Sequence, residues 1–328
     1  MQRPTTKYLL LGFIIGAIVT SAVGRLIFTH NVTLLAGQSI PVRQKNSPYT
    51  FVNPVLYYET PETKSFTEYT NLEKKIDDFI SQNKSALQVD NASVYFRDLT
   101  HGYWVGINEN DTYQPHSLLK VAYLIAYLKE VDSDPRLLDK MLLYAADLKR
   151  EVQNVPLENN SDLVVGQSYT VKVLLDKMIV KSDNVAKDIL LAHIDQNSLT
   201  EVFTDLGIEV PENGDYVIST KTYASFFRIL YNSTYLSRDS SEAALQLLNN
   251  AEFEYGIRAS IPASIKISHK YGIDAPSNTG NNLELHDCGI VYKPGSPYLI
   301  CIMTKGHSIP NLSTMIQGVS DLVYKDFK

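Results

Sequence analysis

The sequence lacks every spacing of cysteine and histidine that is typical of a metal site. It contains two cysteines, Cys288 and Cys301, and its seven histidines are scattered without an HxxxH or CxxC pattern. Because zinc sites are usually marked by such spacings, we predict no metal and no cofactor. The run His286-Asp287-Cys288 falls in a predicted strand, where we interpret it as packing and surface chemistry.

A basic block is also absent. The chain has 30 lysines and arginines against 36 aspartates and glutamates, a net charge of −6, which argues against a nucleic-acid partner. No internal repeat or low-complexity tract is present. A chain of 328 residues with 44% hydrophobic residues can bury a large core, and mixed folds of this size are often single units.

Long hydrophobic runs are missing except at the N-terminus, where residues 8–24 form an uninterrupted apolar and small-residue stretch. Its length is close to the lower limit for a membrane-spanning helix, about 17–25 residues. Two basic residues precede it and would stay in the cytoplasm. We predict a transmembrane anchor over residues 1–28, and a single-pass protein of the cell membrane with the rest exported. The alternative is a cleaved signal peptide, with Ser21-Ala22-Val23-Gly24 as a small-residue cleavage region.

The remaining chain divides into a tether and one domain. Residues 29–68 carry scattered proline, asparagine and threonine and are predicted to be an extracytoplasmic tether, of which 51–56 is apolar enough to pack on the domain surface. Residues 69–328 are the predicted domain.

The periodicity of apolar residues predicts the elements of this domain. In chain order they are a helix with Leu72, Ile76, Phe79 and Ile80 on one face, strands at 93–99 and 102–107, a mostly helical region from 116 to 250, strand character at 264–268, a hairpin over 285–305, and a last helix with a stripe from Leu312 to Val323. The fold class is therefore mixed α/β (α+β), with one antiparallel sheet formed from both ends of the domain and a helical lobe inserted between them.

The hairpin carries both cysteines. They face each other directly if the turn closes tightly on Pro294-Gly295, and are diagonal neighbours if the turn has four residues. An exported chain can oxidise such a pair, but two buried free thiols fit the sequence equally well.

A short motif, Ser117-Leu118-Leu119-Lys120, begins the helical region. A serine three residues before a lysine places a hydroxyl and an amine on one helix face. A neutral lysine there can take the serine proton and activate a weak nucleophile. The pattern alone is not specific, because Ser81-Gln82-Asn83-Lys84 matches it too. Ser117 could also be a helix N-cap.

Two further motifs follow in order: Ser182-Asp183-Asn184 after a helical segment and Lys270-Tyr271-Gly272 at the end of a predicted strand. Separately they could be a cap or turn and a solvated strand end with a glycine bulge. Together the three motifs resemble the signature of class A β-lactamases and penicillin-binding proteins. The similarity extends over about residues 70–328, including 166–171 and 198–207. It implies a β-lactamase/transpeptidase-like fold.

The resemblance implies a role for each catalytic residue. Ser117 would attack an amide or lactam carbonyl, and Lys120 would remove its proton. Lys120 can act only when it is neutral, so burial and cations such as Lys270 must lower its pKa. Ser182 would pass a proton to the departing nitrogen.

Binding roles follow from the same resemblance. Asn184 would donate to the acyl side chain and accept from Lys120. Lys270, in one motif with Tyr271 and Gly272, would supply a positive charge for a substrate carboxylate. The backbone N–H groups of Ser117 and Ile273 would form an oxyanion hole, worth about 3–4 kcal/mol per donor.

The chain departs from the family pattern at two places. Tyr271 replaces the small hydroxyl residue that helps bind the substrate carboxylate, which puts the substrate in doubt. The loop that carries a deacylating glutamate in class A β-lactamases is shortened here. Glu209 and Glu212 are candidates, and Glu209 stands four residues before Asn213 as in the family motif, but the flanking segments align best with that motif deleted.

These observations predict a β-lactamase-like serine hydrolase that forms an acyl-enzyme on Ser117 and releases it slowly. Its partner would be a small-molecule β-lactam or a D-alanyl peptide of peptidoglycan, with membrane attachment through the N-terminal helix. The alternatives are a D,D-peptidase-like cell-wall enzyme and a non-catalytic wall-binding module with the same fold.

Overall fold

The computed structural model describes residues 40–43, 48–59, 67–148, 161–208, 216–273 and 282–328. The chain divides into two compact units, residues 1–40 with 58–64 and residues 41–57 with 65–328. The predicted anchor over residues 1–28 lies outside the described residues. Among the helices that are described, none has the length and hydropathy needed to cross a membrane.

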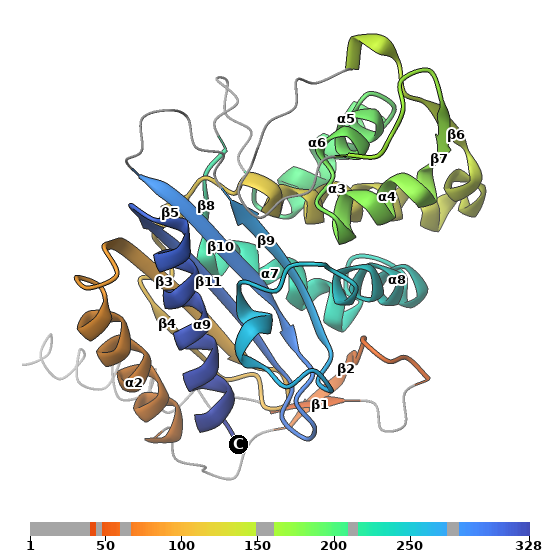
Figure 1. Ribbon diagram of the computed structural model, residues 1–328. Helices are drawn as coiled ribbons and strands as arrows, with labels where there is room; N and C mark the ends of the chain where they lie inside the picture. The colour runs from red at the N-terminus through yellow and green to blue at the C-terminus, as the bar shows by residue number, and fades with distance from the viewer. Residues whose placement is uncertain (1–39, 44–47, 60–66, 149–160, 209–215, 274–281) are drawn as a thin grey trace, which may run out of the picture. The chain divides into compact units, whose positions relative to one another are not determined.

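The second unit is built on a five-stranded antiparallel sheet (Figure 1). Its strands, in the order in which they lie side by side, are β4 (Trp104–Ile107), β3 (Val89–Asp98), β11 (Tyr298–Gly306), β10 (Leu283–Val291) and β9 (Ile267–Ile273). Segments from the start and the end of the domain therefore pair directly, through β3 and β11. The sequence prediction of one antiparallel sheet formed from both ends is confirmed.

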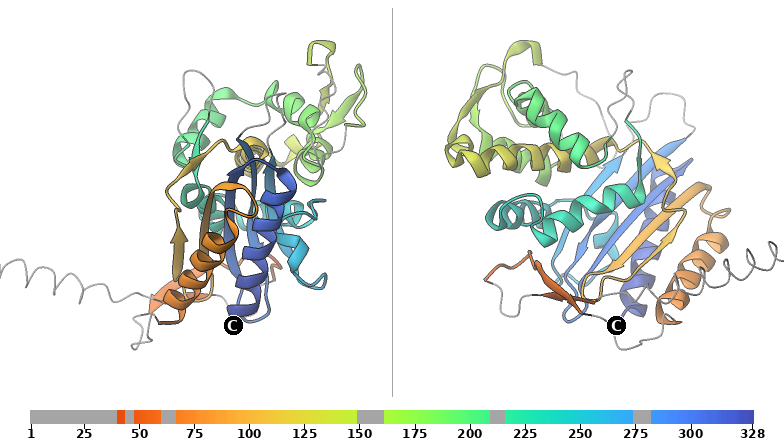
Figure 2. Two further views of the ribbon diagram at one scale, coloured as in Figure 1. Left: turned by 60° about the vertical axis from the view of Figure 1, so that its left-hand side comes forward. Right: turned by 180° about the vertical axis from the view of Figure 1, so that it is seen from behind.

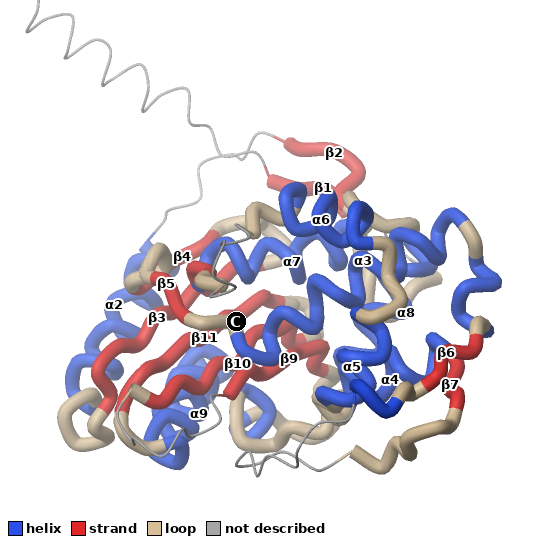
Figure 3. The backbone as a smooth tube through the Cα atoms, turned by 90° about the horizontal axis from the view of Figure 1, so that it is seen from above, coloured by secondary structure: helices blue, strands red, loops and turns tan. Residues whose placement is uncertain are grey.

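One face of the sheet is covered by helices α2 (Thr67–Asn83) and α9 (Ile309–Asp326), with the 3₁₀ helix η4 (Ile257–Ser260) beside α9 (Figures 1 and 3). In α2, Leu72, Ile76 and Ile80 are buried, so one helical stripe faces the core as predicted. The two helices approach closely at Gly318, where a Cβ atom would lie 2.2 Å from the Phe79 ring.

The other face carries α7 (Thr220–Asn232) and α8 (Arg238–Asn249). The rear view in Figure 2 (right) shows α7 crossing the strands on this face. The helical lobe packs on α8 through α3 and α4. The lobe and its connections comprise η1 (His116–Leu119), α3 (Lys120–Ser133), η2 (Pro135–Asp139), β6 (Met141–Leu143), η3 (Ala146–Leu148), β7 (Ser168–Thr170), α4 (Val171–Val180), α5 (Asn184–Leu191) and α6 (Gln196–Asp205). Strands β6 and β7 pair, as do β5 (Thr112–Tyr113) and β8 (Ile218–Ser219).

Part of the predicted tether belongs to the second unit. Phe51 and Val52 are buried in the core that faces the lobe. The Glu242 carboxylate on α8 accepts hydrogen bonds from three consecutive N–H groups, those of Thr50, Phe51 and Val52, at 2.6–2.9 Å. The expectation that this segment packs on the domain is met. The flanking strands β1 (Ile40–Arg43) and β2 (Val55–Glu59) form a two-stranded sheet.

Strand β9 differs from its predicted position. The sequence predicts a strand at 264–268 that ends at the lysine motif, whereas β9 runs through that motif from Ile267 to Ile273. Its partner β10 pairs along the whole of it, from Ile267 opposite Val291 to Ile273 opposite Leu285. All seven residues of β9 are buried, including polar ones, so apolar periodicity could not mark the strand.

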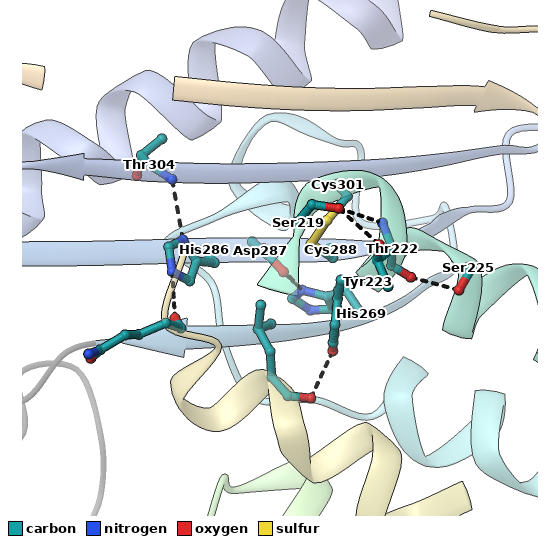
Figure 4. The surroundings of a disulfide bond; sticks show 12 residues. Ser219, Thr222, Tyr223, Ser225, His269, His286, Asp287, Cys288, Cys301 and Thr304 are labelled. Atoms are coloured by element: carbon teal, nitrogen blue, oxygen red, sulfur yellow. Dashed lines mark hydrogen bonds and ion pairs between the residues drawn. A yellow bond between two sulfur atoms is a disulfide. The ribbon is translucent and has the colours of Figure 1, made fainter. Parts of the chain in front are cut away.

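The two cysteines form a disulfide across the centre of the sheet (Figure 4). Cys288 on β10 lies directly opposite Cys301 on β11, and on its other side it lies opposite Lys270 on β9. The alternative with directly facing cysteines is therefore the observed one, and the thiols are not free. The cross-link joins the strand next to Lys270 to the middle strand of the sheet.

We expect that replacing Cys288 and Cys301 together by alanine lowers the free energy of unfolding by about 2–3 kcal/mol, because the cross-link restricts the unfolded chain. The two residues are 13 apart in sequence, a loop short enough to keep the effect moderate. Urea unfolding of the full chain, with and without reductant, measures the difference. Reductant should shift the wild-type midpoint and leave that of the double variant unchanged; equal unfolding free energies for the oxidised wild type and the double variant would contradict the expectation.

Candidate active site

The predicted nucleophile and its lysine lie at the junction of η1 and α3. Ser117 is in η1, and Lys120 begins α3 one turn later. The Lys120 Nζ atom donates a hydrogen bond to Ser117 Oγ at 2.9 Å. The first residue before η1 is Pro115, and no side chain caps this helix, so the alternative of Ser117 as an N-cap is wrong.

Lys120 also contacts the second motif. Its amine donates to the Ser182 carbonyl oxygen at 2.5 Å and to Ser182 Oγ at 3.0 Å. From β9, the Lys270 amine donates to the same Ser182 Oγ at 2.9 Å. The three side chains come from α3, the α4–α5 turn and β9, and they are 1%, 2% and 0% exposed for Lys120, Ser182 and Lys270. The interpretation of Lys270 as a solvated strand end is therefore wrong.

The arrangement brings two lysine amines to one buried hydroxyl oxygen. A buried ammonium group loses its hydration, and two like charges near one acceptor repel each other. Both lysine amines are within hydrogen-bonding distance of the single Ser182 hydroxyl oxygen. A neutral amine 2.9 Å from a serine hydroxyl is a group that can accept its proton.

The backbone at Ser182 is set by the residue that follows it. Ser182 has φ +55°, in the left-handed region. Asp183 is the N-cap of α5, and its carboxylate accepts hydrogen bonds from the N–H groups of Val185 and Ala186 at 2.8 and 3.0 Å. The cap interpretation thus holds for Asp183, while Ser182 faces the lysines. Asn184 is half-buried as the first residue of α5.

Gly272 is required by the close approach of η1 to β9. A Cβ atom at this position would lie 2.7 Å from the Pro115 carbonyl oxygen and 3.0 Å from Leu118 Cγ. The residue lies within a regular strand pairing, opposite His286, and is not a bulge. Ile273 follows it at the end of β9, which is the edge strand of the sheet. On an edge strand alternate N–H groups face away from the sheet and are available to other partners.

Tyr271 packs into the core on the α9 side of the sheet. It is 4% exposed, and its ring stacks on Phe253 with centroids 3.9 Å apart. The Lys270 amine lies 4.1 Å from the centroid of the Tyr271 ring, a cation–π distance. Aromatic packing therefore occupies a position where the family places a small hydroxyl.

One set of sequence candidates does not join the site, and another lies outside the described residues. Ser81 and Lys84, the second match to the serine–lysine pattern, are both exposed at the end of α2. Glu209, Glu212 and Asn213 lie outside the described residues.

One cluster next to Ser117 was not predicted. His116, Glu284 and His286 each bring one ligand-type atom within 4.8 Å of the others. His286 is fully buried, so its assignment to surface chemistry is wrong. Glu284 and His286 alternate along β10 and share one face, but nothing in the sequence places them beside His116, which is far away in the chain.

A family model described as the β-lactamase enzyme family matches residues 71–327. No curated protein matches the chain. The fold is similar to a mutant of PBP-A solved as an acyl-enzyme complex with penicillin G (23% identity, TM-score 0.67, 79% of this chain and 96% of that chain).

Two β-lactamase structures are similar to the same extent. One is from Chitinophaga pinensis (19% identity, TM-score 0.69, 79% of this chain and 100% of that chain), and the other is the TLA-1 extended-spectrum enzyme (16% identity, TM-score 0.68, 78% and 98%). At these identities the structures establish the fold, and the resemblance read from the three motifs is confirmed at that level.

The positive φ of Ser182 predicts a difference in unfolding free energy between two variants. Ser182→Gly and Ser182→Ala both remove the hydroxyl and differ only in the Cβ atom. Because a left-handed backbone costs an L-residue roughly 1–2 kcal/mol, we expect the glycine variant to be the more stable of the two by about 1 kcal/mol. Thermal or urea unfolding measures the difference; an alanine variant as stable as the glycine variant would show that this backbone is not strained.

Proposed function

Since this chain belongs to the β-lactamase enzyme family, we propose that it is a serine hydrolase that forms an acyl-enzyme on Ser117. The observation that carries the proposal is the hydrogen bond from the buried Lys120 amine to Ser117 Oγ, made while the same amine contacts Ser182. A fold kept only as a binding module has no need of a buried amine at the nucleophile.

The acylation step follows from these contacts. Neutral Lys120 takes the Ser117 proton as Oγ bonds to the substrate carbonyl carbon, and the carbonyl oxygen becomes an oxyanion facing the N–H groups of Ser117 and Ile273. The proton then passes from Lys120 through the Ser182 hydroxyl to the amide nitrogen as the carbon–nitrogen bond breaks. The protein side is left with an ester on Ser117 and a neutral Lys120. Lys270 keeps Ser182 in place and adds positive charge on the β9 side.

The proposed substrate is an amide next to a carboxylate, either a β-lactam or a D-alanyl peptide of the cell wall. Lys270 would attract the carboxylate, and Asn184 would contact the acyl side chain. The Tyr271 ring packs on Phe253, so a tyrosine in the core stands where the family has the small hydroxyl residue that helps bind the carboxylate.

We infer that deacylation is slow. It requires a water activated by a base, and the segment between the end of α6 at Asp205 and the start of β8 at Ile218 is short. Glu209 and Glu212 in this segment are the candidate bases. The site would work outside the cytoplasm, with the apolar N-terminal stretch as its membrane anchor.

The nucleophile is tested by covalent labelling. We expect a fluorescent penicillin to label the full-length protein, Ser117→Ala to abolish the label, and Lys120→Ala to slow labelling by about 10²–10⁴-fold, the range for loss of a general base. Ser81→Ala is the matched control, because Ser81 has the same spacing to a lysine but is exposed on α2, and it should label at the wild-type rate. Label that survives Ser117→Ala would rule out this nucleophile, and no label on the folded wild type would favour the binding module.

Turnover of a chromogenic cephalosporin tests the release step. With slow deacylation, the full-length protein should give a single burst equal to the enzyme concentration and then little further colour. Glu209→Gln and Glu212→Gln measured beside the wild type show whether either glutamate supports the residual rate. Steady turnover without a burst would mean that deacylation keeps pace with acylation, and the inference of slow release would be wrong.

A further inference from the structure

Two of the three residues before the nucleophile, Gln114 and His116, contact side chains of β10. The Gln114 N–H donates to Glu284 Oε2 at 3.1 Å, and the Gln114 carbonyl oxygen lies 3.1 Å from His286 Nε2. His116 Nε2 lies 3.3 Å from the same Glu284 Oε2. Both backbone groups of Gln114 and the side chain of His116 are thus engaged by two residues of one strand.

The hydrogen bonds of His286 determine which nitrogen carries its proton. The Thr304 N–H donates to His286 Nδ1 at 3.3 Å, as Figure 4 shows, so Nδ1 is the acceptor and Nε2 the donor. Burial lowers the pKa of His286, which keeps the ring neutral at neutral pH. His286 therefore donates to the Gln114 carbonyl in a defined tautomer.

This tautomer decides between a metal site and a hydrogen-bond network. Two histidines and a glutamate within 4.8 Å have the composition of a zinc site. A histidine that binds zinc offers the lone pair of one ring nitrogen and usually donates from the other. The His286 nitrogen that faces Glu284 in this cluster is Nε2, 3.4 Å from Glu284 Oε2. Here Nε2 is the donor and Nδ1 faces an N–H group. The contacts therefore fit a network that holds the backbone.

The network acts on a strained part of the chain. His116 has φ +47°, and such a conformation persists in a residue other than glycine only where its surroundings hold it. Burial alone would raise the pKa of Glu284, but hydrogen bonds with His116 and His286 lower it to about 2, so the carboxylate is charged and a strong acceptor.

Residues 114–116 also contact β9, the strand whose Ile273 N–H is the second proposed oxyanion donor. The Pro115 carbonyl oxygen packs against Gly272, which precedes Ile273 on β9. Gly272 lies opposite His286 in the β9–β10 pairing. Residues 114–116 are thus fixed against two adjacent strands, one of which ends at Ile273.

We propose that Glu284 and His286 are positioning residues that fix the N–H of Ser117 relative to the N–H of Ile273, so that both donors meet one developing oxyanion. This assignment rests on the proposed acyl-enzyme function. Both side chains are buried, at 7% exposure for Glu284 and 0% for His286, and they contact Gln114 and His116. Substrate binding should therefore depend on them little, and the rate of bond formation should depend on them strongly.

Acylation kinetics of the full-length protein test the proposal. Rates of labelling over a range of fluorescent penicillin concentrations separate the binding constant from the acylation rate constant. For Glu284→Ala we expect the rate constant to fall about 10- to 100-fold, as for a small misplacement of catalytic groups, with the binding constant changed by less than about threefold. Glu284→Gln keeps an acceptor for the Gln114 N–H and should recover part of the loss.

A matched control separates positioning from general damage to the sheet. Asp287 is the next residue on β10 and so points to the opposite face, where its carboxylate contacts His269 at 2.9 Å and accepts from the Ile257 N–H at 2.8 Å. Asp287→Asn should leave the acylation rate constant within about twofold of the wild type. An equal loss in both variants, or no loss in Glu284→Ala, overturns the proposal.

Two further measurements keep the test independent of the proposed function. Amide hydrogen exchange over residues 114–118 should be faster in Glu284→Ala and unchanged in Asp287→Asn. If the wild type takes up no penicillin, the proposed function fails and the exchange result alone decides the positioning role. A wild-type acylation rate that falls with EDTA and returns with Zn²⁺ would show that a metal holds the cluster, which also overturns the hydrogen-bond proposal.

Discussion

The hydroxyl of Ser182 accepts hydrogen bonds from two buried lysine amines, and the rest of the second unit is arranged around this contact. Lys120 comes from the first residue of α3 and Lys270 from the edge strand β9, so the lobe and the sheet must meet at the α4–α5 turn. Taking a charged amine out of water costs several kcal/mol unless it is partnered. Apolar cores on both faces of the sheet supply the rigidity that keeps the groups together.

Much of the fold could be predicted because its outer elements follow simple periodicities. The buried stripe of α2, the hairpin of β10 and β11 and the stripe of α9 each repeat apolar residues at the spacing of their element. Strand β9 was placed too early because its middle consists of buried polar residues, among them Lys270 in the site and His269, which contacts Asp287 on the opposite face. The sequence could not predict the disulfide, because whether Cys288 lies directly opposite Cys301 depends on the geometry of the hairpin turn, and the sequence allowed two such geometries.

The candidate site was predictable only in part. Three short motifs identified Ser117, Lys120, Ser182 and Lys270, and the structure brings these four together. The side chains that hold the chain before Ser117 could not be found, because Glu284 is 170 residues from Gln114 and its role depends on the tertiary structure. The orientation of Tyr271 was also open, since a tyrosine on a strand can face a cleft or a core, and here it stacks on Phe253.

The central claim is that Ser117 becomes acylated, and peptide mapping by mass spectrometry tests it most directly. The full-length protein is incubated with benzylpenicillin, digested, and its peptides are sequenced by fragmentation. The account predicts a mass increase equal to one intact penicillin on the peptide that contains Ser117, with the modification on that serine. An adduct on another residue, or an unmodified Ser117 peptide from folded protein at saturating penicillin, would contradict it.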